Sequence, residues 1–281
     1  MNATNGSSSK IAGLSVSVVA FRPDLGQLTR TLSGLGAACE ALREFRPTIP
    51  VDLYLIDNGG VPNVDSVLDG LRAHDIVCSK IAGHGNVGYG RGHNLAIERA
   101  TSRYHLVLNP DIDIDRAAFV RALDFFDAQP DAGLLTPWVG DRNGQQQYLC
   151  RRYPVVLDLL ARGFFPAPLR GLFSRRFDRY EMRDQINDRD IVWDPPIVSG
   201  CFMLFRTEVL KKLAGFDPRY FLYFEDYDLS LRTHDVARVA YVPSVRILHH
   251  GGGAARKGLT HIRMFAASAY KFFNRFGWKW L

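Results

Sequence analysis

A short stretch, YFLYFEDYDLSLR at residues 220–232, places three carboxylates directly after a run of aromatic side chains. The acids are Glu225, Asp226 and Asp228. The pattern predicts a helix that begins at the acids, and negative charge in a first helical turn is favoured by roughly 0.3–1 kcal/mol. That effect accounts for one or two acids but not for the aromatic approach. Partial burial raises a carboxyl pKa, and such a carboxylate suits a general base.

Oxygen-bearing side chains also gather in LVLNPDIDID, residues 106–115, at the predicted end of a strand. Asp111, Asp113 and Asp115 alternate there. Carboxylate and amide oxygens at a strand end suit a hard divalent cation such as Mg²⁺ or Mn²⁺, which shares its ligands with substrate phosphates. We interpret Asp115 as a helix cap and Asp111 as the cation ligand, and leave Asp113 open.

Two histidines, His249 and His250, follow an apolar strand and precede three glycines in RILHHGGGAA. A lone histidine is more often structural than a ligand, but a strand end beside a glycine-rich loop favours a ligand. His249 is therefore a candidate nitrogen ligand for the same cation.

A glycine-rich loop, GHGNVGYGRGHN at residues 83–94, leads into a predicted helix. Its backbone amides could approach a phosphate closely. The loop lacks the full spacing of a dinucleotide fingerprint and the lysine of a P-loop. A plain strand-to-helix connection explains it equally well when it is considered alone.

The elements that must position these residues follow an α/β pattern. β-branched runs predict strands at 14–21, 51–60, 76–81 and 104–110, and helical spacing predicts helices at 24–45, 63–73, from about 94, and at 115–126. This alternation predicts a mostly parallel central sheet with helices on both faces. Short connections predict that the later strands, at 133–140, 191–206 and 238–250, are partly antiparallel.

In such sheets ligands bind beyond the carboxyl ends of the strands. The rule places four segments along one rim: residues 21–24, 57–60, 83–92 and 109–113. The glycine-rich loop and the candidate cation ligands at 109–113 are therefore expected at the same edge of the sheet.

Composition supports one catalytic domain at residues 11–250, preceded by a disordered stretch at 1–10 and followed by a basic aromatic tail at 251–281. No apolar run reaches the roughly 18–20 residues that cross a bilayer, and the first residues lack the order of a signal peptide. The four cysteines are scattered, which argues against a disulfide framework or a zinc site and favours the cytoplasm.

The net charge of +6 permits anionic partners. The excess is concentrated at 151–183 and 256–280, where Arg and Lys mix with aromatic and aliphatic residues. The tail fits an interfacial amphipathic helix and fits equally a helix packed on the catalytic domain. No recognised nucleic-acid-binding motif is present, so no nucleic-acid partner is expected.

Six segments, taken together and in order, resemble family 2 inverting glycosyltransferases, particularly their bacterial rhamnosyltransferase-like branch. They are VSVVAF, DNGG, GNVGYGRGHNLAI, LNPDI, SGCFMLFRTEVLKKLAGFDPRYFLYFEDYDLSLR and ILHHGG. The resemblance covers residues 13–275, and its most specific part runs from the Ser-Gly pair to the acids. It implies the GT-A nucleotide-diphospho-sugar transferase fold, a divalent cation, Mg²⁺ or Mn²⁺, and a single displacement that inverts the anomeric carbon.

The resemblance also implies roles for individual residues. Asp226 matches the catalytic base, and Ser199 and Gly200 match an acceptor-side loop. Asp111 and His249 match the cation ligands, with His250 as the alternative if the register slips by one. Positions that match the nucleotide-sugar site are Phe21, Arg22, Asp57, Asn86, Gly88, Arg91, Asn94, Asn109 and Asp111.

Asn109 stands where the family carries the first acid of Asp-x-Asp, which leaves Asp111 as the principal ligand. Because one base suffices, Glu225 is a candidate acceptor contact. Asp228 is expected to pair with Arg232 one helical turn on.

The implied reaction moves L-rhamnose from dTDP-L-rhamnose onto a saccharide or lipid-linked saccharide in the synthesis of a surface polysaccharide such as the O-antigen of lipopolysaccharide. The alternatives are UDP-galactose, UDP-glucose or UDP-N-acetylglucosamine as donor, and a non-catalytic nucleotide-binding protein. A lipid-linked acceptor would bring the protein to the cytoplasmic face of the inner membrane as a peripheral partner.

Overall fold

The first half of the chain alternates strands and helices. The computed structural model describes residues 13–165, 171–251 and 258–280, so the N-terminal stretch expected to be disordered lies outside the described residues. The elements in this half are β1 (Leu14–Ala20), α1 (Leu25–Phe45), β2 (Val51–Asp57), α2 (Asp65–Ala73), β3 (Ile76–Ile81), α3 (Tyr89–Ile97), β4 (Tyr104–Leu108), β5 (Ile112–Ile114), α4 (Ala118–Ala128) and β6 (Ala132–Gly140).

The second half is less regular. Its elements are α5 (Val156–Phe164), α7 (Ser174–Tyr180), β7 (Val192–Trp193), β8 (Phe202–Arg206), α8 (Thr207–Lys212), α9 (Glu225–Thr233), β9 (Arg238–His249) and α10 (Leu259–Phe276). The strand expected at 191–206 is interrupted between β7 and β8. Pro195 and Pro196 lie in the gap and donate no backbone N–H to a sheet, which explains the break.

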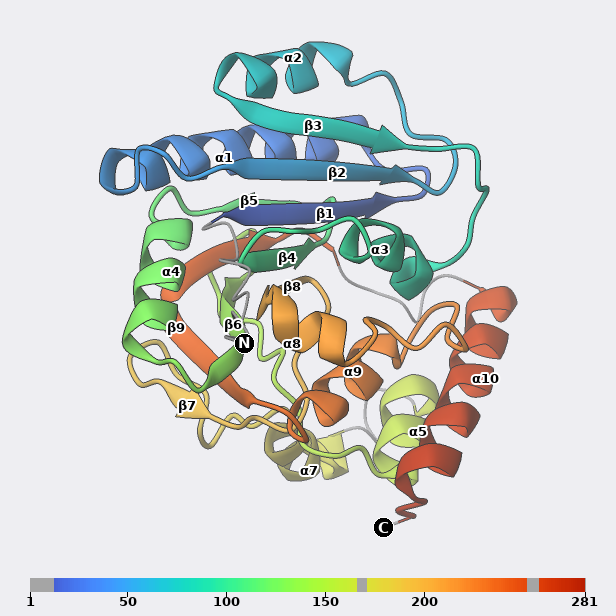
Figure 1. Ribbon diagram of the computed structural model, residues 1–281. Helices are drawn as coiled ribbons and strands as arrows, with labels where there is room; N and C mark the ends of the chain where they lie inside the picture. The colour runs from blue at the N-terminus through green and yellow to red at the C-terminus, as the bar shows by residue number, and fades with distance from the viewer. Residues whose placement is uncertain (1–12, 166–170, 252–257, 281) are drawn as a thin grey trace, which may run out of the picture.

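The described strands form one nine-stranded sheet in the order β3-β2-β1-β4-β8-β6-β9-β5, with β7 paired to β9 (Figure 1). The pairs β1/β2, β1/β4, β2/β3 and β6/β9 are parallel. The pairs made by β8, β5 and β7 are antiparallel. The α/β class, its parallel core and its partly antiparallel later strands are therefore confirmed.

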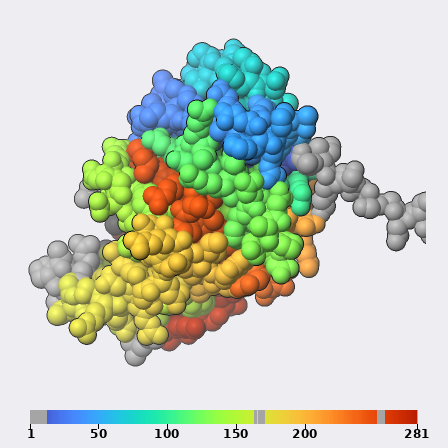
Figure 2. Space-filling model, turned by 90° about the vertical axis from the view of Figure 1, so that its left-hand side faces the viewer, coloured from blue at the N-terminus to red at the C-terminus, as the bar shows by residue number. Residues whose placement is uncertain are grey.

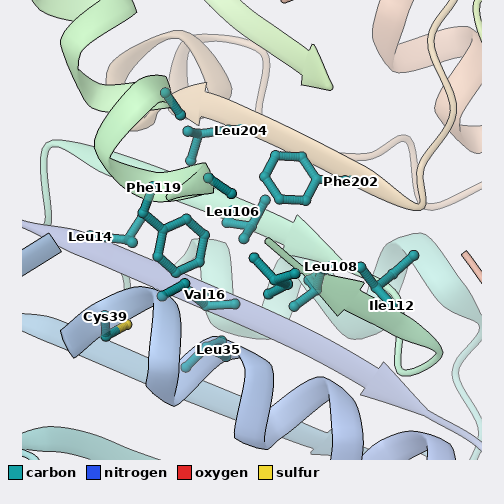
Figure 3. Packing of buried hydrophobic residues seen from close by; sticks show 14 of the residues in the cluster. Leu14, Val16, Leu35, Cys39, Leu106, Leu108, Ile112, Phe119, Phe202 and Leu204 are labelled. Carbon is teal, nitrogen blue, oxygen red and sulfur yellow. The ribbon is translucent and has the colours of Figure 1, made fainter. Parts of the chain in front are cut away.

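Alternation along β1, LSVSVVA, sends its side chains to two different layers. Leu14, Val16 and Val18 join the core that α1, α2 and α4 cover. Figure 3 shows Leu14 and Val16 in this core, between α1 and Phe119 of α4. On the other face, Ser15 and Ser17 are fully buried beneath α3. The sheet thus has an apolar core on one side and a polar network within its other layer.

The polar network contains two fully buried histidines, His93 of α3 and His105 of β4. Ser17 Oγ lies 2.7 Å from His93 Nδ1 and 2.9 Å from His105 Nε2, and Ser15 Oγ lies 2.7 Å from His105 Nδ1. Burial lowers the pKa of His105 to about 3 and that of His93 well below its usual value. Both rings are therefore neutral in the folded protein.

At the opposite end of the molecule from β3, helices α5, α7 and α10 form a separate layer (Figure 1). The segment around α7 (yellow) projects from the body in Figure 2. Within the described ranges, no helix is long and apolar enough to cross a membrane.

Candidate functional site

The loops that follow β1 and β2 are joined to each other. Asp57, at the end of β2, accepts hydrogen bonds through Oδ1 from the N–H groups of Gly59 (2.9 Å) and Val61 (3.3 Å). Its Oδ2 lies 3.3 Å from Lys80 Nζ. The Arg22 N–H donates to the Gly59 carbonyl at 2.9 Å. Asp57 therefore shapes the turn against which the Phe21–Arg22 loop rests.

The glycine-rich loop is held by side-chain amides and by a distant backbone. Asn86 Oδ1 accepts from the Gly88 N–H at 3.1 Å, and Asn58 Nδ2 donates to the Gly88 carbonyl at 3.0 Å. Gly88 has a φ of 90°, and a Cβ there would lie 2.4 Å from the Phe221 carbonyl oxygen. A glycine is required because the segment leading to the acids crosses directly over this loop.

Helix α3 begins at Tyr89, five residues earlier than the expected start at Asn94. Asn94 donates to the Phe216 carbonyl (2.8 Å) and accepts from its N–H (2.9 Å). Arg91 Nε donates to the Pro218 carbonyl at 2.6 Å. These two side chains thus fasten the approach to the acids, rather than projecting free from the loop.

Asp111 and His249 face each other across the β5/β9 pair. Asp111 Oδ1 lies 3.6 Å from His249 Nε2, and it is buried with no hydrogen-bond donor among the described residues. A Cβ on Gly251 would lie 2.3 Å from Asp111 Oδ2 and 2.6 Å from His249 Nε2. Burial lowers the pKa of His249, which favours the neutral, ligand-competent ring. An unpartnered carboxylate oxygen beside an imidazole nitrogen fits a divalent cation.

The neighbouring pair, His250 and Asp113, is arranged differently. His250 Nε2 lies 2.6 Å from Asp113 Oδ2, and Asp113 Oδ1 lies 3.7 Å from Arg30 Nε. Across the described part of the chain, no group of three or more His, Cys, Asp or Glu side chains is gathered as a metal site. The two protein ligands would therefore need further oxygens from a bound substrate.

A strained turn delivers the acids of α9. Tyr223 (φ 69°) and Phe224 (φ 65°) both adopt the left-handed conformation, which costs roughly 1–3 kcal/mol for each non-glycine residue. Phe224 is buried against Phe272 of α10, with ring centroids 5.2 Å apart. Aromatic packing thus holds the turn that directs Glu225 and Asp226.

The three acids have different surroundings. Asp226 is partly exposed, and it accepts from the Gly200 N–H through Oδ2 and from the Tyr227 N–H through Oδ1, both at 3.0 Å. Glu225 is 5% exposed, and its Oε2 has no hydrogen-bond partner within the described residues. Asp228 is fully buried and lies 2.6 Å from Arg232 Nε, so the expected pairing is confirmed.

Burial raises the pKa of both neighbouring carboxyls. It raises the pKa of Glu225 to about 8, with a contribution from the charge of Asp226. The pKa of Asp226 is raised by burial and lowered by its two backbone hydrogen bonds. Because Asp226 accepts two backbone N–H groups and Glu225 Oε2 accepts none, Asp226 is the more readily ionised member of the pair.

Tyr89 connects the two halves of the site, although nothing in its own segment singles it out. Its hydroxyl lies 3.0 Å from Asn109 Oδ1 and 2.6 Å from the Gly200 carbonyl oxygen. Ser199 lies next to Gly200, and its Oγ accepts from the Cys201 N–H at 3.3 Å. The end of β4, the acceptor-side loop and Asp226 are thus joined through one side chain and one glycine.

The sequence has clear relatives. Residues 30–214 match the family model described as "Glycosyl transferase family 2". The chain is 28% identical over 279 residues to an N-acetylglucosaminyl-diphospho-decaprenol L-rhamnosyltransferase of Mycobacterium tuberculosis, covering 92% of this chain and 83% of the relative. It is 26% identical over 188 residues to rhamnosyltransferase WbbL of Escherichia coli, covering 62% and 67%.

The fold also matches solved structures. S. aureus TarS 1–349 in complex with UDP superposes with a TM-score of 0.56 at 14% identity, covering 93% of this chain and 66% of that one. GalNAc-T7 with UDP, GalNAc and Mn²⁺ superposes with a TM-score of 0.64 at 11% identity, covering 94% and 48%. The family match ends before Asp226 and His249, so their roles depend on the local geometry described above.

Proposed function

Because the chain belongs to glycosyl transferase family 2, we propose that it transfers L-rhamnose from dTDP-L-rhamnose onto a lipid-linked saccharide in the synthesis of a cell-surface polysaccharide. The two rhamnosyltransferase relatives support the sugar, and the name of the mycobacterial relative supports an acceptor with a lipid diphosphate. The reaction would take place at the cytoplasmic face of the membrane that holds the acceptor.

One structural observation carries the assignment of the active site. Tyr89 and Gly200 join Asn109, beside the metal candidate, to Asp226 through contacts of 2.6–3.0 Å. A donor diphosphate at the strand ends and an acceptor hydroxyl at Asp226 would therefore meet in one continuous site. This proximity is what a single displacement requires.

The proposed reaction uses the chain's own residues as follows. The carboxylate of Asp226 removes the proton of the acceptor hydroxyl, whose oxygen attacks the anomeric carbon from the face opposite the diphosphate. The bond from that carbon to the leaving phosphate oxygen breaks, and its electron pair stays on the oxygen. The protonated carboxyl of Glu225 donates a hydrogen bond to the acceptor sugar and leaves proton removal to Asp226.

Asp111 and His249 would hold an Mg²⁺ or Mn²⁺ ion, whose charge stabilises the developing negative charge on the leaving diphosphate. The Phe21–Arg22 loop, Asp57 and the backbone of the glycine-rich loop would contact the nucleotide and its phosphates. Asn94 and Arg91 would act by positioning the 216–218 segment, which contacts both α3 and the approach to α9.

A donor screen tests the proposal. The purified chain is incubated with Mg²⁺ or Mn²⁺, a lipid-diphosphate-linked saccharide and, in turn, dTDP-L-rhamnose or the UDP-sugars, and release of the nucleotide diphosphate is measured. We expect acceptor-dependent release from dTDP-L-rhamnose and its loss on chelation. Faster turnover of a UDP-sugar would overturn the donor, and acceptor-dependent release unaffected by EDTA would overturn the cation.

A further inference from the structure

The excess positive charge is confined to one part of the chain. Residues 151–183 and 256–281 contain 14 of the 35 Arg and Lys residues but 3 of the 29 Asp and Glu residues. The rest of the chain contains 21 basic and 26 acidic residues, so it is net negative. We call the described residues 151–165, 171–183 and 258–280 the basic lobe. The basic lobe is net positive, whereas the rest of the chain is net negative.

Exposed apolar side chains gather in the same lobe. Seven of the thirteen exposed large hydrophobic residues in the described ranges belong to it, although it is a minor part of the chain. At its end, Tyr270, Trp278 and Trp280 are 61%, 40% and 62% exposed. Trp278 and Trp280 are stacked with ring centroids 5.1 Å apart, and Tyr270 lies 6.1 Å from Trp278. These three rings form an aromatic ladder of the kind that favours a membrane–water interface.

A basic cavity adjoins the ladder. Its volume is about 660 Å³, and its walls include four cations, Arg152, Arg176, Arg179 and Lys279, and two carboxylates, Asp158 and Asp194, the second of which pairs with Arg238. Arg152 is paired with Asp184 and Arg176 with Asp158, each at 2.7 Å. Arg179 and Lys279 form no ion pair with any carboxylate in the described part of the chain, and Lys279 lies 4.4 Å above the Tyr153 ring. Two cations therefore remain for an anionic group.

The basic lobe packs against α9, with α5 and α10 beside this helix and α7 below it in Figure 1. The Tyr180 hydroxyl lies 2.7 Å from the hydroxyl of Tyr227, and Tyr227 directly follows Asp226 in the chain. Phe272 of α10 contacts the Tyr227 ring with centroids 6.0 Å apart. The backbone N–H of Val156, at the start of α5, donates to the Lys279 carbonyl at 2.9 Å. The ladder, the cavity and α9 thus belong to one packed unit.

We propose that the basic lobe docks on an anionic bilayer, with Tyr270, Trp278 and Trp280 in the headgroup region and Arg179 and Lys279 facing lipid phosphates. Amphipathic rings and neighbouring cations are the two features by which proteins attach to such a surface without spanning it. This inference rests on the proposed function, because it names the face that meets the membrane holding the acceptor lipid.

Vesicle sedimentation of the full chain tests the docking face. We expect binding to vesicles of phosphatidylcholine and phosphatidylglycerol, at least about tenfold weaker binding to pure phosphatidylcholine, and weakening at about 500 mM salt. The double variant Trp278→Ala/Trp280→Ala and the double variant Arg179→Glu/Lys279→Glu should each lose about tenfold in affinity. Phe45→Ala and Lys212→Glu, which are exposed residues outside the lobe, are the matched controls and should bind as the wild type does.

Two outcomes would overturn the docking face. One is no binding of the wild type to anionic vesicles, and the other is that both lobe variants bind these vesicles as tightly as the wild type does. Unchanged sugar transfer to a water-soluble acceptor shows that a variant is folded. Vesicle binding needs neither donor nor acceptor. A protein that binds vesicles but transfers no sugar would therefore overturn the function alone, and one that transfers sugar but binds no vesicles would overturn the docking alone.

Discussion

The donor-side edge of the sheet and the basic lobe are built in different ways. At the sheet edge, Phe21, Asp57 and Asn109 lie at the ends of β1, β2 and β4, whose side chains are mostly buried, and backbone N–H groups hold Asp57 in place. In the lobe, the helices are held by aromatic contacts and expose many of their charges. Under the two proposals above, the first region would set the chemistry and the second would set where the enzyme works. Substitutions at the sheet edge should therefore impair sugar transfer, whereas substitutions in the lobe should impair vesicle binding.

The largest effect is expected at Asp226. Asp226→Asn removes the proposed base while keeping the shape of the side chain, and we expect kcat to fall by about 10²–10⁴ with every acceptor. Glu225→Gln is the matched control, because it retains a hydrogen-bond donor beside the site and should lose much less. Release of nucleotide diphosphate measures both variants. Equal losses in the two, or full activity in Asp226→Asn, would reject the division of roles.

The next largest effect is expected at Gly251. In Gly251→Ala the new Cβ would lie 2.3 Å from Asp111 Oδ2 and 2.6 Å from His249 Nε2, so the two candidate ligands must move apart. A displacement of about 1 Å costs about 10²-fold in rate, and the cation concentration for half-maximal activity should rise. Gly70→Ala is the control, since nothing lies within 4 Å of its added Cβ. An unchanged cation requirement in Gly251→Ala would contradict the metal assignment.

Acid should destabilise the sheet beneath the donor edge. His105 has a pKa of about 3 in the folded protein and about 6.5 when unfolded, so between these values the unfolded chain binds a proton that the folded one does not. The contribution is complete above pH 6.5 and is lost as the pH falls, by up to about 1.4 kcal/mol per pH unit. Urea unfolding at several pH values measures this slope. We expect a shallower slope in His105→Asn, and an identical one would count against the burial argument.

A smaller effect is expected where the lobe meets helix α9. Arg275 of α10 lies 2.7 Å from Asp217 Oδ2 and 2.8 Å from the buried Asp228 Oδ1. Because Arg275 is about one-third exposed and Arg232 still pairs with Asp228, Arg275→Ala should lower the free energy of unfolding by about 1 kcal/mol. Arg72→Ala, which removes an exposed ion pair with Asp69, should change it by less than about 0.5 kcal/mol. Thermal or urea unfolding compares the two variants. Equal free energies of unfolding would show that Arg275 of α10 contributes little to the stability of α9.

The sequence predicts the sheet edge better than the lobe, for physical reasons. Strand and helix periods identify the first seven elements, from β1 to β4, and the strand-end rule brings Asp57 and Asp111 to one rim. The i,i+4 spacing likewise predicts the Asp228–Arg232 pair. These features depend on local pattern and on one topological rule.

Contacts between distant segments escape such reasoning. Tyr89 meets Gly200 across 111 positions, and nothing in its own neighbourhood indicates the contact. The need for glycine at Gly251 follows from Asp111, which lies far away in the sequence in the turn between β4 and β5. In the lobe, α10 buries Phe272 and Phe273, as a helix packed on the catalytic domain would, whereas an interfacial role for its exposed face, which includes Tyr270, stays a prediction.

The configuration of the product tests the central claim most directly. The wild-type chain is given dTDP-L-rhamnose and a saccharide acceptor, and the anomeric configuration of the new glycosidic bond is determined by NMR. A single displacement with Asp226 as base predicts a configuration opposite to that of the donor. A product that retains the donor configuration would require a second displacement and would contradict the account.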